Sequence, residues 1–406
     1  MQSISYTAAP RADRGARSLR PFRGPAFALL AIALLLLSGC KSDTLVVGAV
    51  LPLSGPDQAV GEEARKGLEL AAAEWVAKGN ERLDLRIVDS AGDPAQAAAQ
   101  LKDLFENQKA VAAFASGDDL EARALVDIAT QAERLLILTA AEDQELGAAS
   151  PFVYRLSTSL YSAGTKVATF SARKLDAKKA ALIAQDERFA GAMESGFGPS
   201  FSNIGGEYLG SRVAEDLSVE TVRELRKAKC DTIVLSGDST WMQKTLETLR
   251  SASYKGHIFA PQSFATPSNL EEMGKSARGV VFAATAVQGT EAGTTFSEAY
   301  RQAHESEATI FAAEAYDTLN VFMTAAQERP AIVSEIKRGL RDQIKSFDGA
   351  SGNIEFDETG APKKFPSLYS LDRQLAKRDH EAFTDERLAK IKRLKNRIST
   401  MGAGSR

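Results

Sequence analysis

The sequence predicts an α/β fold with two doubly wound lobes joined by crossovers, and three observations support this prediction. Short apolar runs alternate with longer helical segments along most of the chain, and the alternation comes in two successive blocks. Several runs are apolar at every position, as in strands of a parallel sheet that helices cover on both faces. Of the 406 residues, 367 follow a 39-residue N-terminal segment, which is enough for two lobes of ordinary domain size.

The first block contains four strands that alternate with helices. Continuous or alternating apolar positions define the strands, and apolar residues at helical spacing define the helices between them. Because strands separated by helices run parallel, we expect right-handed crossovers. The strands are expected at 44–50, 83–90, 110–116 and 135–141, and the helices at 62–78, 94–107 and about 118–132.

The second block repeats the pattern, and a third group of segments follows it. The second block has expected strands at 152–156, 180–186, 206–213, 231–238, 257–262 and 279–286. The third group has expected helices near 294–305, 310–327 and 331–345, then strands at 353–357 and 366–371. We expect these helices to return to the first lobe and the last strands to cross the hinge.

The charged C-terminal tail completes a division of the chain into five parts. Its apolar stripe at Leu388, Ile391, Leu394 and Ile398 indicates a helix packed on, or frayed from, the surface. A partner-binding helix is the alternative. The five expected parts are a signal peptide at 1–39, the first lobe at 40–157, the second lobe at 158–286, a return to the first lobe with hinge-crossing strands at 287–371, and the tail at 372–406.

The N-terminal segment has the features of a lipoprotein signal peptide. Five arginines precede an apolar segment at 25–37, which is too short for the roughly 20 residues of a membrane-spanning helix. The segment Leu37-Ser38-Gly39-Cys40 resembles the bacterial lipobox, in which the cysteine is acylated and becomes the first residue. A chance cysteine is the alternative, but the chain has only two cysteines. We therefore expect several acyl chains on Cys40 to hold the protein on a bilayer.

Composition excludes several other functions. The net charge of −3 and the lack of a basic patch with aromatic residues argue against a nucleic-acid partner. With Cys40 acylated, Cys230 has no partner for an intramolecular disulfide. The three histidines are scattered without metal-ligand spacing, so no metal is expected. The sequence has no motif of a nucleophilic, zinc-dependent or nucleotide-binding enzyme, and we expect neither catalysis nor a cofactor.

Seven motifs in a fixed order resemble the type 1 periplasmic binding proteins of the branched-chain amino acid and amide class. The first is VVGAVLPLSGP at 46–56, followed by GEEARKGLELAAAE. The others are VDSAGDPAQAAAQ, AAFASGDDLEA, LLILTAAEDQEL, FVYRLSTSLYSAG, QDERFAGAMESGF and the late FDGASGNIEFDETGAPKK. The resemblance covers about 44–371. It implies two α/β lobes joined by three crossovers, with a small ligand held in the cleft between them.

Small polar residues follow three of the expected strands, where ligands bind in open α/β sheets. They are found in the stretches 52–55, 115–117 and 236–239. Such residues allow a ligand to approach backbone N–H groups at helix N-termini. Ordinary helix capping is the alternative for each stretch alone. Ser54, Ser116, Gly117 and Ser239 are the candidates from these loops.

The resemblance adds further candidates and a departure from the amino-acid-binding pattern. Members that bind amino acids hold the carboxylate with a serine, here Ser116, and a threonine, whose position Glu142 occupies. The acid that holds the ammonium is replaced by Gln262. Phe189 corresponds to an aromatic residue that stacks on the amine, and Val60 replaces an aromatic wall. Tyr161 and Phe311 remain as pocket walls.

This departure predicts weak binding of ordinary neutral α-amino acids. Glu142 would place a negative charge at the carboxylate end of the ligand, while Gln262 would leave the ammonium without a counter-charge. Two alternatives remain open: the alignment is shifted by one or two residues, or Glu142 points to solvent.

The leading functional hypothesis is a lipid-anchored solute-binding protein that delivers a small polar ligand to an ABC permease. The alternative is an outer-membrane lipoprotein that acts on another envelope protein, for example as an activator of peptidoglycan synthesis, or as a ligand sensor on the same fold. Lys41, in place of aspartate after Cys40, predicts outer-membrane sorting in a cell with two membranes. In either case the protein faces the periplasm or the exterior.

Replacing the acylated cysteine tests the anchor. We expect Cys40→Ser to abolish acylation and to leave a precursor or a soluble product in place of the membrane-bound form. Mass spectrometry of the mature N-terminus is the measurement. A mature chain that starts unmodified at any other residue would contradict the lipoprotein prediction.

Overall fold

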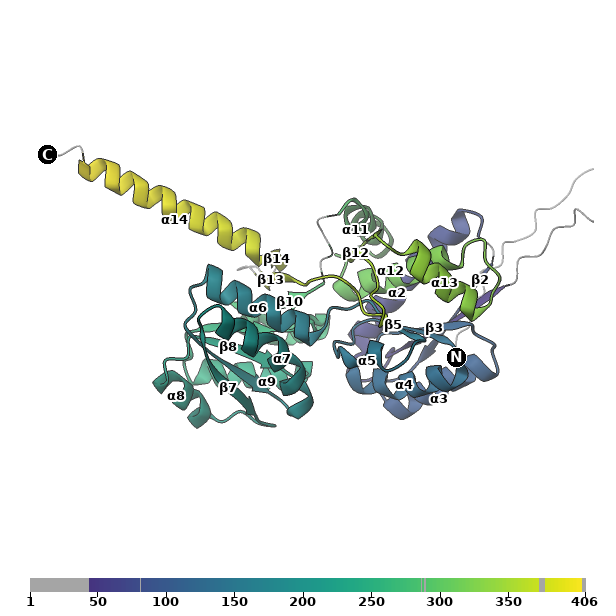
Figure 1. Cartoon of the computed structure of the whole chain (residues 1–406), viewed down its shortest axis with the longest axis horizontal. Helices are drawn as coiled ribbons and strands as arrows, with labels where there is room; N and C mark the ends of the chain where they lie inside the picture. The colour runs from purple at the N-terminus through teal and green to yellow at the C-terminus, as the bar shows by residue number, and fades with distance from the viewer. Residues whose placement is uncertain (1–43, 81, 286, 288–289, 372–376, 404–406) are drawn as a thin grey trace, which may run out of the picture.

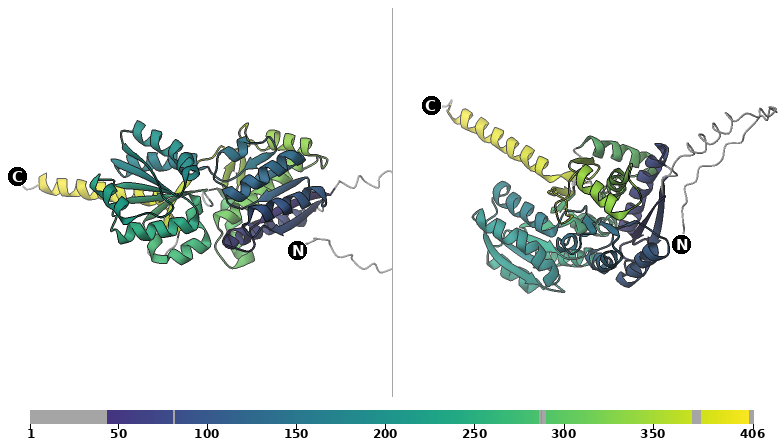
Figure 2. Two further views of the ribbon diagram at one scale, coloured as in Figure 1. Left: turned by 90° about the horizontal axis from the view of Figure 1, so that it is seen from below. Right: turned by 45° about the vertical axis from the view of Figure 1, so that its right-hand side comes forward.

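The computed structural model describes residues 44–80, 82–285, 287, 290–371 and 377–403, and in these ranges the chain forms two α/β lobes (Figure 1). The signal peptide, Cys40 and Lys41 lie outside the described residues. Each lobe is a twisted, largely parallel sheet with helices on both faces, and the two lobes lie side by side (Figure 2). The predicted fold class is confirmed.

The first lobe contains a five-stranded parallel sheet in the order β2-β1-β3-β4-β5. Its strands are β1 (Leu45–Leu51), β2 (Leu83–Asp89), β3 (Ala112–Ala115), β4 (Leu135–Leu138) and β5 (Val153–Arg155). The helices between them are α2 (Gln58–Ala77), α3 (Pro94–Glu106), α4 (Asp119–Ala132) and α5 (Glu145–Ala148).

The second lobe repeats this strand order with β7-β6-β8-β9-β10 and adds two antiparallel strands, β13 and β14, beside β10. Its strands are β6 (Lys179–Ala184), β7 (Glu207–Val213), β8 (Thr232–Ser236), β9 (His257–Ala260), β10 (Val280–Ala284), β13 (Ser367–Leu371) and β14 (Lys377–Asp379). Its helices are α6 (Leu160–Lys174), α7 (Glu187–Asn203), α8 (Val219–Lys227), α9 (Ser239–Ser251) and α10 (Pro267–Met273), with short 3-10 turns at Gln262–Ala265 and Gly274–Ala277.

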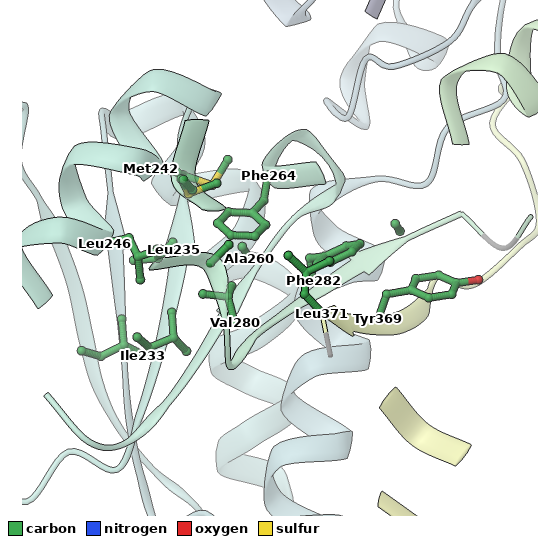
Figure 3. Close-up of a cluster of buried hydrophobic side chains, with 14 of the residues drawn as sticks. Ile233, Leu235, Met242, Leu246, Ala260, Phe264, Val280, Phe282, Tyr369 and Leu371 are labelled. Carbon is green, nitrogen blue, oxygen red and sulfur yellow. The ribbon is translucent and has the colours of Figure 1, made fainter. Parts of the chain in front are cut away.

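The sheet of the second lobe is buried on both faces because its strands are apolar at successive positions. In β8, Ile233 and Leu235 pack into the cluster drawn in Figure 3, whereas Val234 packs on the opposite face. Phe282 lies between Phe264 and Tyr369, with ring centroids 5.9 and 6.0 Å away. Tyr369 belongs to β13, so the late strand completes the core of the second lobe.

Between these strands the chain returns to the first lobe. This return contains α11 (Glu291–His304), α12 (Ile310–Ala326), α13 (Val333–Gln343) and the hairpin of β11 (Phe347–Gly349) and β12 (Gly352–Ile354). Helix α12 is buried on nearly every side and packs along α2. The Asp317 carboxylate on α12 accepts hydrogen bonds from the backbone of Ala350 and Ser351, which fixes the hairpin. The described chain therefore passes between the lobes three times.

The beginning of the C-terminal helix α14 (His380–Ala403) is attached to the second lobe. Lys166 and Lys174 of α6 form ion pairs of 2.8 and 2.6 Å with Glu381 and Asp385. Beyond these contacts the helix extends away from the body (Figure 1). Leu388 and Ile391 of the predicted apolar stripe are 43% and 41% exposed, while the side chains of Leu394 and Ile398 lie outside the described residues.

The close packing of α2 on α12 depends on a residue without a side chain. A Cβ atom on Gly67 would lie 2.1 Å from the carbonyl oxygen of Ala312, so the two helices would have to separate. We expect Gly67→Ala to lower the free energy of unfolding by about 1–3 kcal/mol, as measured by urea denaturation.

The same substitution at Gly191 is the matched control. Gly191 lies inside α7 with no atom within 4 Å of the added Cβ, so Gly191→Ala should stabilise the chain by about 0.5–1 kcal/mol through helix propensity. Equal effects of the two substitutions would show that the α2–α12 contact does not limit stability.

Candidate functional site

A cavity of about 150 Å³ lies between the two lobes, at the carboxyl ends of strands from both sheets. This is the edge at which open α/β sheets bind ligands. The loops after β1, β3 and β4 line it from the first lobe, and the loops after β6, β8 and β9 line it from the second. Its lining residues are Asp57, Val60, Ser116, Gly117, Asp118, Asp119, Leu120, Ala140, Glu142, Gln185, Arg188, Phe189, Gly237, Asp238, Ser239, Ser263, Thr266 and Phe311.

Six of the nine sequence-predicted ligand-binding residues line this cavity, and the other three do not. The six are Ser116, Gly117, Glu142, Phe189, Ser239 and Phe311, and Val60 lines it as well. Ser54 is exposed beside the site, where its hydroxyl donates a 2.7 Å hydrogen bond to Asp89. Tyr161 is 46% exposed on α6. Gln262 is fully buried beneath the cavity floor.

Ser116 presents an unused polar group at the end of β3. The residue is 1% exposed, and its Oγ has no hydrogen-bond partner among the described residues. Buried hydroxyl groups in native proteins nearly always have a partner, so an orphan of this kind indicates a missing ligand or water. Because Ser116 lines the cavity, a ligand bound there could supply the partner.

Glu142 connects the two lobes instead of presenting a charge to the ligand. Its carboxyl group accepts hydrogen bonds of 2.9 and 3.2 Å from the backbone N–H groups of Gln262 and Ser263 in the second lobe. The residue is only 5% exposed, so it does not point to solvent. Burial raises the pKa of Glu142 to about 8, and the nearby charge of Asp119 adds to the rise.

This raised pKa corrects the expected role of Glu142. At neutral pH the carboxyl group is largely protonated, so it does not exert the full repulsion on a ligand carboxylate that the sequence predicted. The sequence identified the residue and its place in the site, but the burial that suppresses its charge comes from packing against a segment 120 residues away.

Gln262 also has a structural role that the sequence prediction missed. Its side-chain N–H group donates 3.3 Å hydrogen bonds to Glu314 on α12, and its side-chain oxygen accepts one of 2.8 Å from the backbone of Thr285. Glu314 is fully buried and also accepts a hydrogen bond from the Thr285 hydroxyl. Gln262 is thus engaged within the hinge and is not placed to hold a ligand ammonium.

Four lining aspartates were not predicted as site residues: Asp57, Asp118, Asp119 and Asp238. Asp119 accepts hydrogen bonds of 2.8 and 3.0 Å from the backbone N–H groups of Glu142 and Asp143. Asp118 and Asp238 occupy N-cap positions, where their carboxylates accept 2.8 Å hydrogen bonds from the backbone of Glu121 and Trp241. Asp57 is the N-cap residue of α2 but makes no side-chain capping hydrogen bond. The available signal was the position of Asp118 and Asp238 in the short loops that follow β3 and β8.

Arg188 lies on the second-lobe wall of the cavity and makes two contacts there. Arg188 forms a 2.7 Å ion pair with Asp186, and its guanidinium lies 5.5 Å from the ring centroid of Phe189. It is exposed, so its charge is shared with solvent and with Asp186. Among the described residues that line the cavity, Arg188 is the only basic one, against five carboxyl groups.

The described residues contain no cluster of three or more metal-ligating side chains, and no described helix is both long and apolar enough to cross a bilayer.

Comparisons with known proteins agree with this geometry. The sequence pattern of the periplasmic binding protein family matches residues 44–365. Leu/Ile/Val-binding protein homolog 6 of Brucella abortus (strain 2308) is 24% identical over 344 residues, which cover 80% of this chain and 85% of the relative. A leucine-binding protein from Thermotoga maritima superposes with a TM-score of 0.75 at 20% identity, covering 82% of this chain and 97% of that one. A solute-binding protein from R. palustris in complex with benzoate gives a TM-score of 0.70 at 20% identity, covering 82% and 94%.

The two-lobed fold and the interlobe cavity define a solute-binding protein. The match over most of its length shows that the chain belongs to the periplasmic binding protein family. Proteins of this family bind substrates and are not enzymes, and membership implies an extracytoplasmic location.

A buried carboxyl group behind the Gly117 loop makes stability depend on pH. Glu121 is 1% exposed, its Oε2 accepts a 3.0 Å hydrogen bond from Ser90, and burial raises its pKa to about 8. Between about pH 4.5 and 8 the folded state keeps a proton that the unfolded state has released. The free energy of unfolding therefore falls as pH rises through this window, by up to about 1.4 kcal/mol per pH unit for this group.

Glu121→Gln should remove the contribution of this group to the slope because the amide does not titrate but can still accept the Ser90 hydrogen bond. The contribution of Glu142, whose pKa burial also raises to about 8, should remain. The measurement is the urea midpoint from pH 4.5 to 9. Glu247→Gln, which removes an exposed carboxylate on α9, is the control and should leave the slope unchanged. Parallel curves for the wild type and Glu121→Gln would mean that Glu121 ionises normally in the folded state.

Proposed function

We propose that this protein is a lipid-anchored solute-binding protein that captures a small polar ligand in the interlobe cavity and delivers it to an ABC permease. The observation that carries the proposal is the cavity itself, which both lobes line at the carboxyl ends of their strands. The unpaired Ser116 hydroxyl supports the same site because a bound ligand would satisfy it.

The proposed anchor is the acylated Cys40, and the proposed location is the outer surface of a membrane. The basic N-terminus, the short apolar segment and the lipobox-like Leu37-Ser38-Gly39-Cys40 support the anchor. Lys41 supports the outer membrane where the cell has two membranes. The permease is proposed from the family, whose members serve ABC importers.

We propose further that the ligand is not an ordinary neutral α-amino acid. The aspartates that line the cavity, rather than Glu142, disfavour a ligand carboxylate. The helix N-termini that would hold a ligand carboxylate already carry the side chains of Asp118 and Asp238, and Asp57 lies on the same cavity. Structural relatives crystallised with isoleucine and with benzoate illustrate that ligands differ on this fold.

A second candidate function is an interaction protein of the outer membrane, such as an activator of peptidoglycan synthesis, or a ligand sensor. The projecting helix α14, with Leu388 and Ile391 exposed beyond its contacts with α6, favours this candidate. An exposed apolar stripe on a helix is a common docking element for a partner protein.

Calorimetry with leucine and valine tests the proposed ligand class. A ligand carboxylate about 4 Å from one uncompensated aspartate meets a repulsion of about 4 kcal/mol at an effective dielectric constant of about 20, close to a thousandfold in affinity. We expect dissociation constants no tighter than about 1 mM for either amino acid. Micromolar binding of leucine would contradict the proposal.

A thermal-shift screen of small metabolites separates the two candidate functions. A true ligand at 100 times its dissociation constant adds about 2.7 kcal/mol to the free energy of unfolding. If no small molecule shifts the melting temperature and the protein retains an envelope protein through α14, the result would support the interaction candidate instead.

A further inference from the structure

We propose that the interlobe cavity binds a small organic cation, an amine or amidine without a carboxylate, held by Asp57 and Asp118 of the first lobe and Asp238 of the second. This inference rests on the proposed function, because it assumes that the cavity is the ligand site. It names the class of ligand that the site selects.

The charge of the lining residues is the first support. Five carboxyl groups and one guanidinium line the cavity in the described part of the chain. The carboxyl group of Glu142 is hydrogen-bonded to the second lobe, and Arg188 is paired with Asp186 outside the lining set. Asp119 accepts hydrogen bonds from the backbone of Glu142 and Asp143 and lies near Arg123 and Arg155. Asp57, Asp118 and Asp238 therefore have no unpaired cation among the described lining residues as a counter-charge.

The arrangement of the three aspartates is the second support. They lie at the beginnings of α2, α4 and α9, so they approach the cavity from both lobes. Burial raises the pKa of Asp57, and the charges of Asp118 and Asp238 raise it further, which places the three carboxylates within electrostatic reach of one another. A cation between them would relieve this mutual repulsion.

Helix capping explains two of these residues but not the third. The carboxylates of Asp118 and Asp238 are engaged at their helix N-termini, and Asp238 also accepts a 2.6 Å hydrogen bond from Gln185. The Asp57 carboxylate makes no hydrogen bond to any described residue although it is half-buried. A ligand ammonium is the partner that an unpaired, half-buried carboxylate requires.

Ser116 supplies an independent observation at the same place. Its side chain is almost completely buried, lines the cavity and has an Oγ without a partner in the described chain. A hydroxyl oxygen accepts hydrogen bonds from N–H groups, so Ser116 can complete the coordination of an ammonium or amidinium that Asp57 neutralises.

The walls and size of the cavity limit the rest of the ligand. Val60, Leu120, Phe189 and Phe311 provide an apolar lining. Aromatic rings attract cations as well as apolar groups, so Phe189 and Phe311 suit an organic cation better than a hydrated metal ion. A cavity of about 150 Å³ holds a molecule of about the size of benzene. A short alkylamine or an arylamidine fits these limits.

Two isosteric series test the charge preference. The first is isobutylamine, isobutyramide and isobutyrate, and the second is benzamidine, benzamide and benzoate, each titrated by calorimetry into the wild-type protein. We expect the cation of each series to bind at least tenfold more tightly than the amide, with no detectable binding of the carboxylate. We also expect the cation affinity to fall as salt rises from 50 to 500 mM, about an order of magnitude in ionic strength.

Asp57→Asn is the decisive variant because it removes the charge and keeps the shape. It should weaken binding of the cation by about 10- to 100-fold. In the absence of ligand it should raise Tm, since the repulsion from Asp118 and Asp238 is removed. Asp127→Asn on the exposed side of α4 is the matched control and should change neither quantity. Ser116→Ala should also weaken binding of the cation, and it should leave Tm in the absence of ligand close to that of the wild type.

The outcomes separate this inference from the proposed function. Binding of the amides or carboxylates in preference to the cations would overturn the cation assignment and leave the solute-binding function intact. Failure of all six compounds and of the metabolite screen would overturn both. Equal effects of Asp57→Asn and Asp127→Asn on cation affinity would remove Asp57 from the site.

Discussion

The hydrogen bonds buried beneath the cavity hold the two lobes in register, and the geometry of the site depends on them. Glu142 of the first lobe accepts hydrogen bonds from the backbone of the second, and Gln262 of the second lobe binds Glu314 of the first. Each connection joins a loop at a strand end to the opposite lobe, so the loops that line the cavity are fixed relative to one another. A buried carboxyl group without these partners would destabilise the fold, which gives the hinge a preferred arrangement.

The acidic residues in and behind the site are of two kinds, which differ in burial. Glu142 and Glu121 are buried, and the desolvation of each favours its protonated form. Asp118 and Asp238 are exposed, and helix N-termini stabilise their charges. The negative potential in the cavity therefore comes from Asp57 and from the exposed N-cap residues Asp118 and Asp238. It does not come from Glu142, which the family resemblance places at the ligand carboxylate. Burial, and not the number of acidic residues, decides which of them contribute negative charge to the cavity.

Local patterns account for most of what the sequence predicted correctly. Continuous apolar runs such as 231–238 are strands because both faces are buried, and strand ends followed by small polar residues led to Ser116, Gly117 and Ser239. The failures involve partners distant in sequence. Nothing near Gln262 in the chain reveals that Glu314 and Thr285 surround it, and the exposure of Tyr161 depends on how α6 lies on the second lobe. Asp57 precedes α2 in the loop after β1, but only the meeting of the lobes shows that Asp118 and Asp238 share its cavity.

The packing of α2 on α12 has a consequence for how the chain acquires its structure. Gly67 and Ala312 lie side by side although they are 245 positions apart in the sequence, so the first lobe cannot bury the apolar side of α2 until the chain as far as α12 is available. The parallel strands of the second lobe, by contrast, lie within one continuous segment, 179–284, and close shorter loops. The parallel strands of the second lobe can thus pair before α12 reaches α2, although β13 completes the core of that lobe only after the return segment.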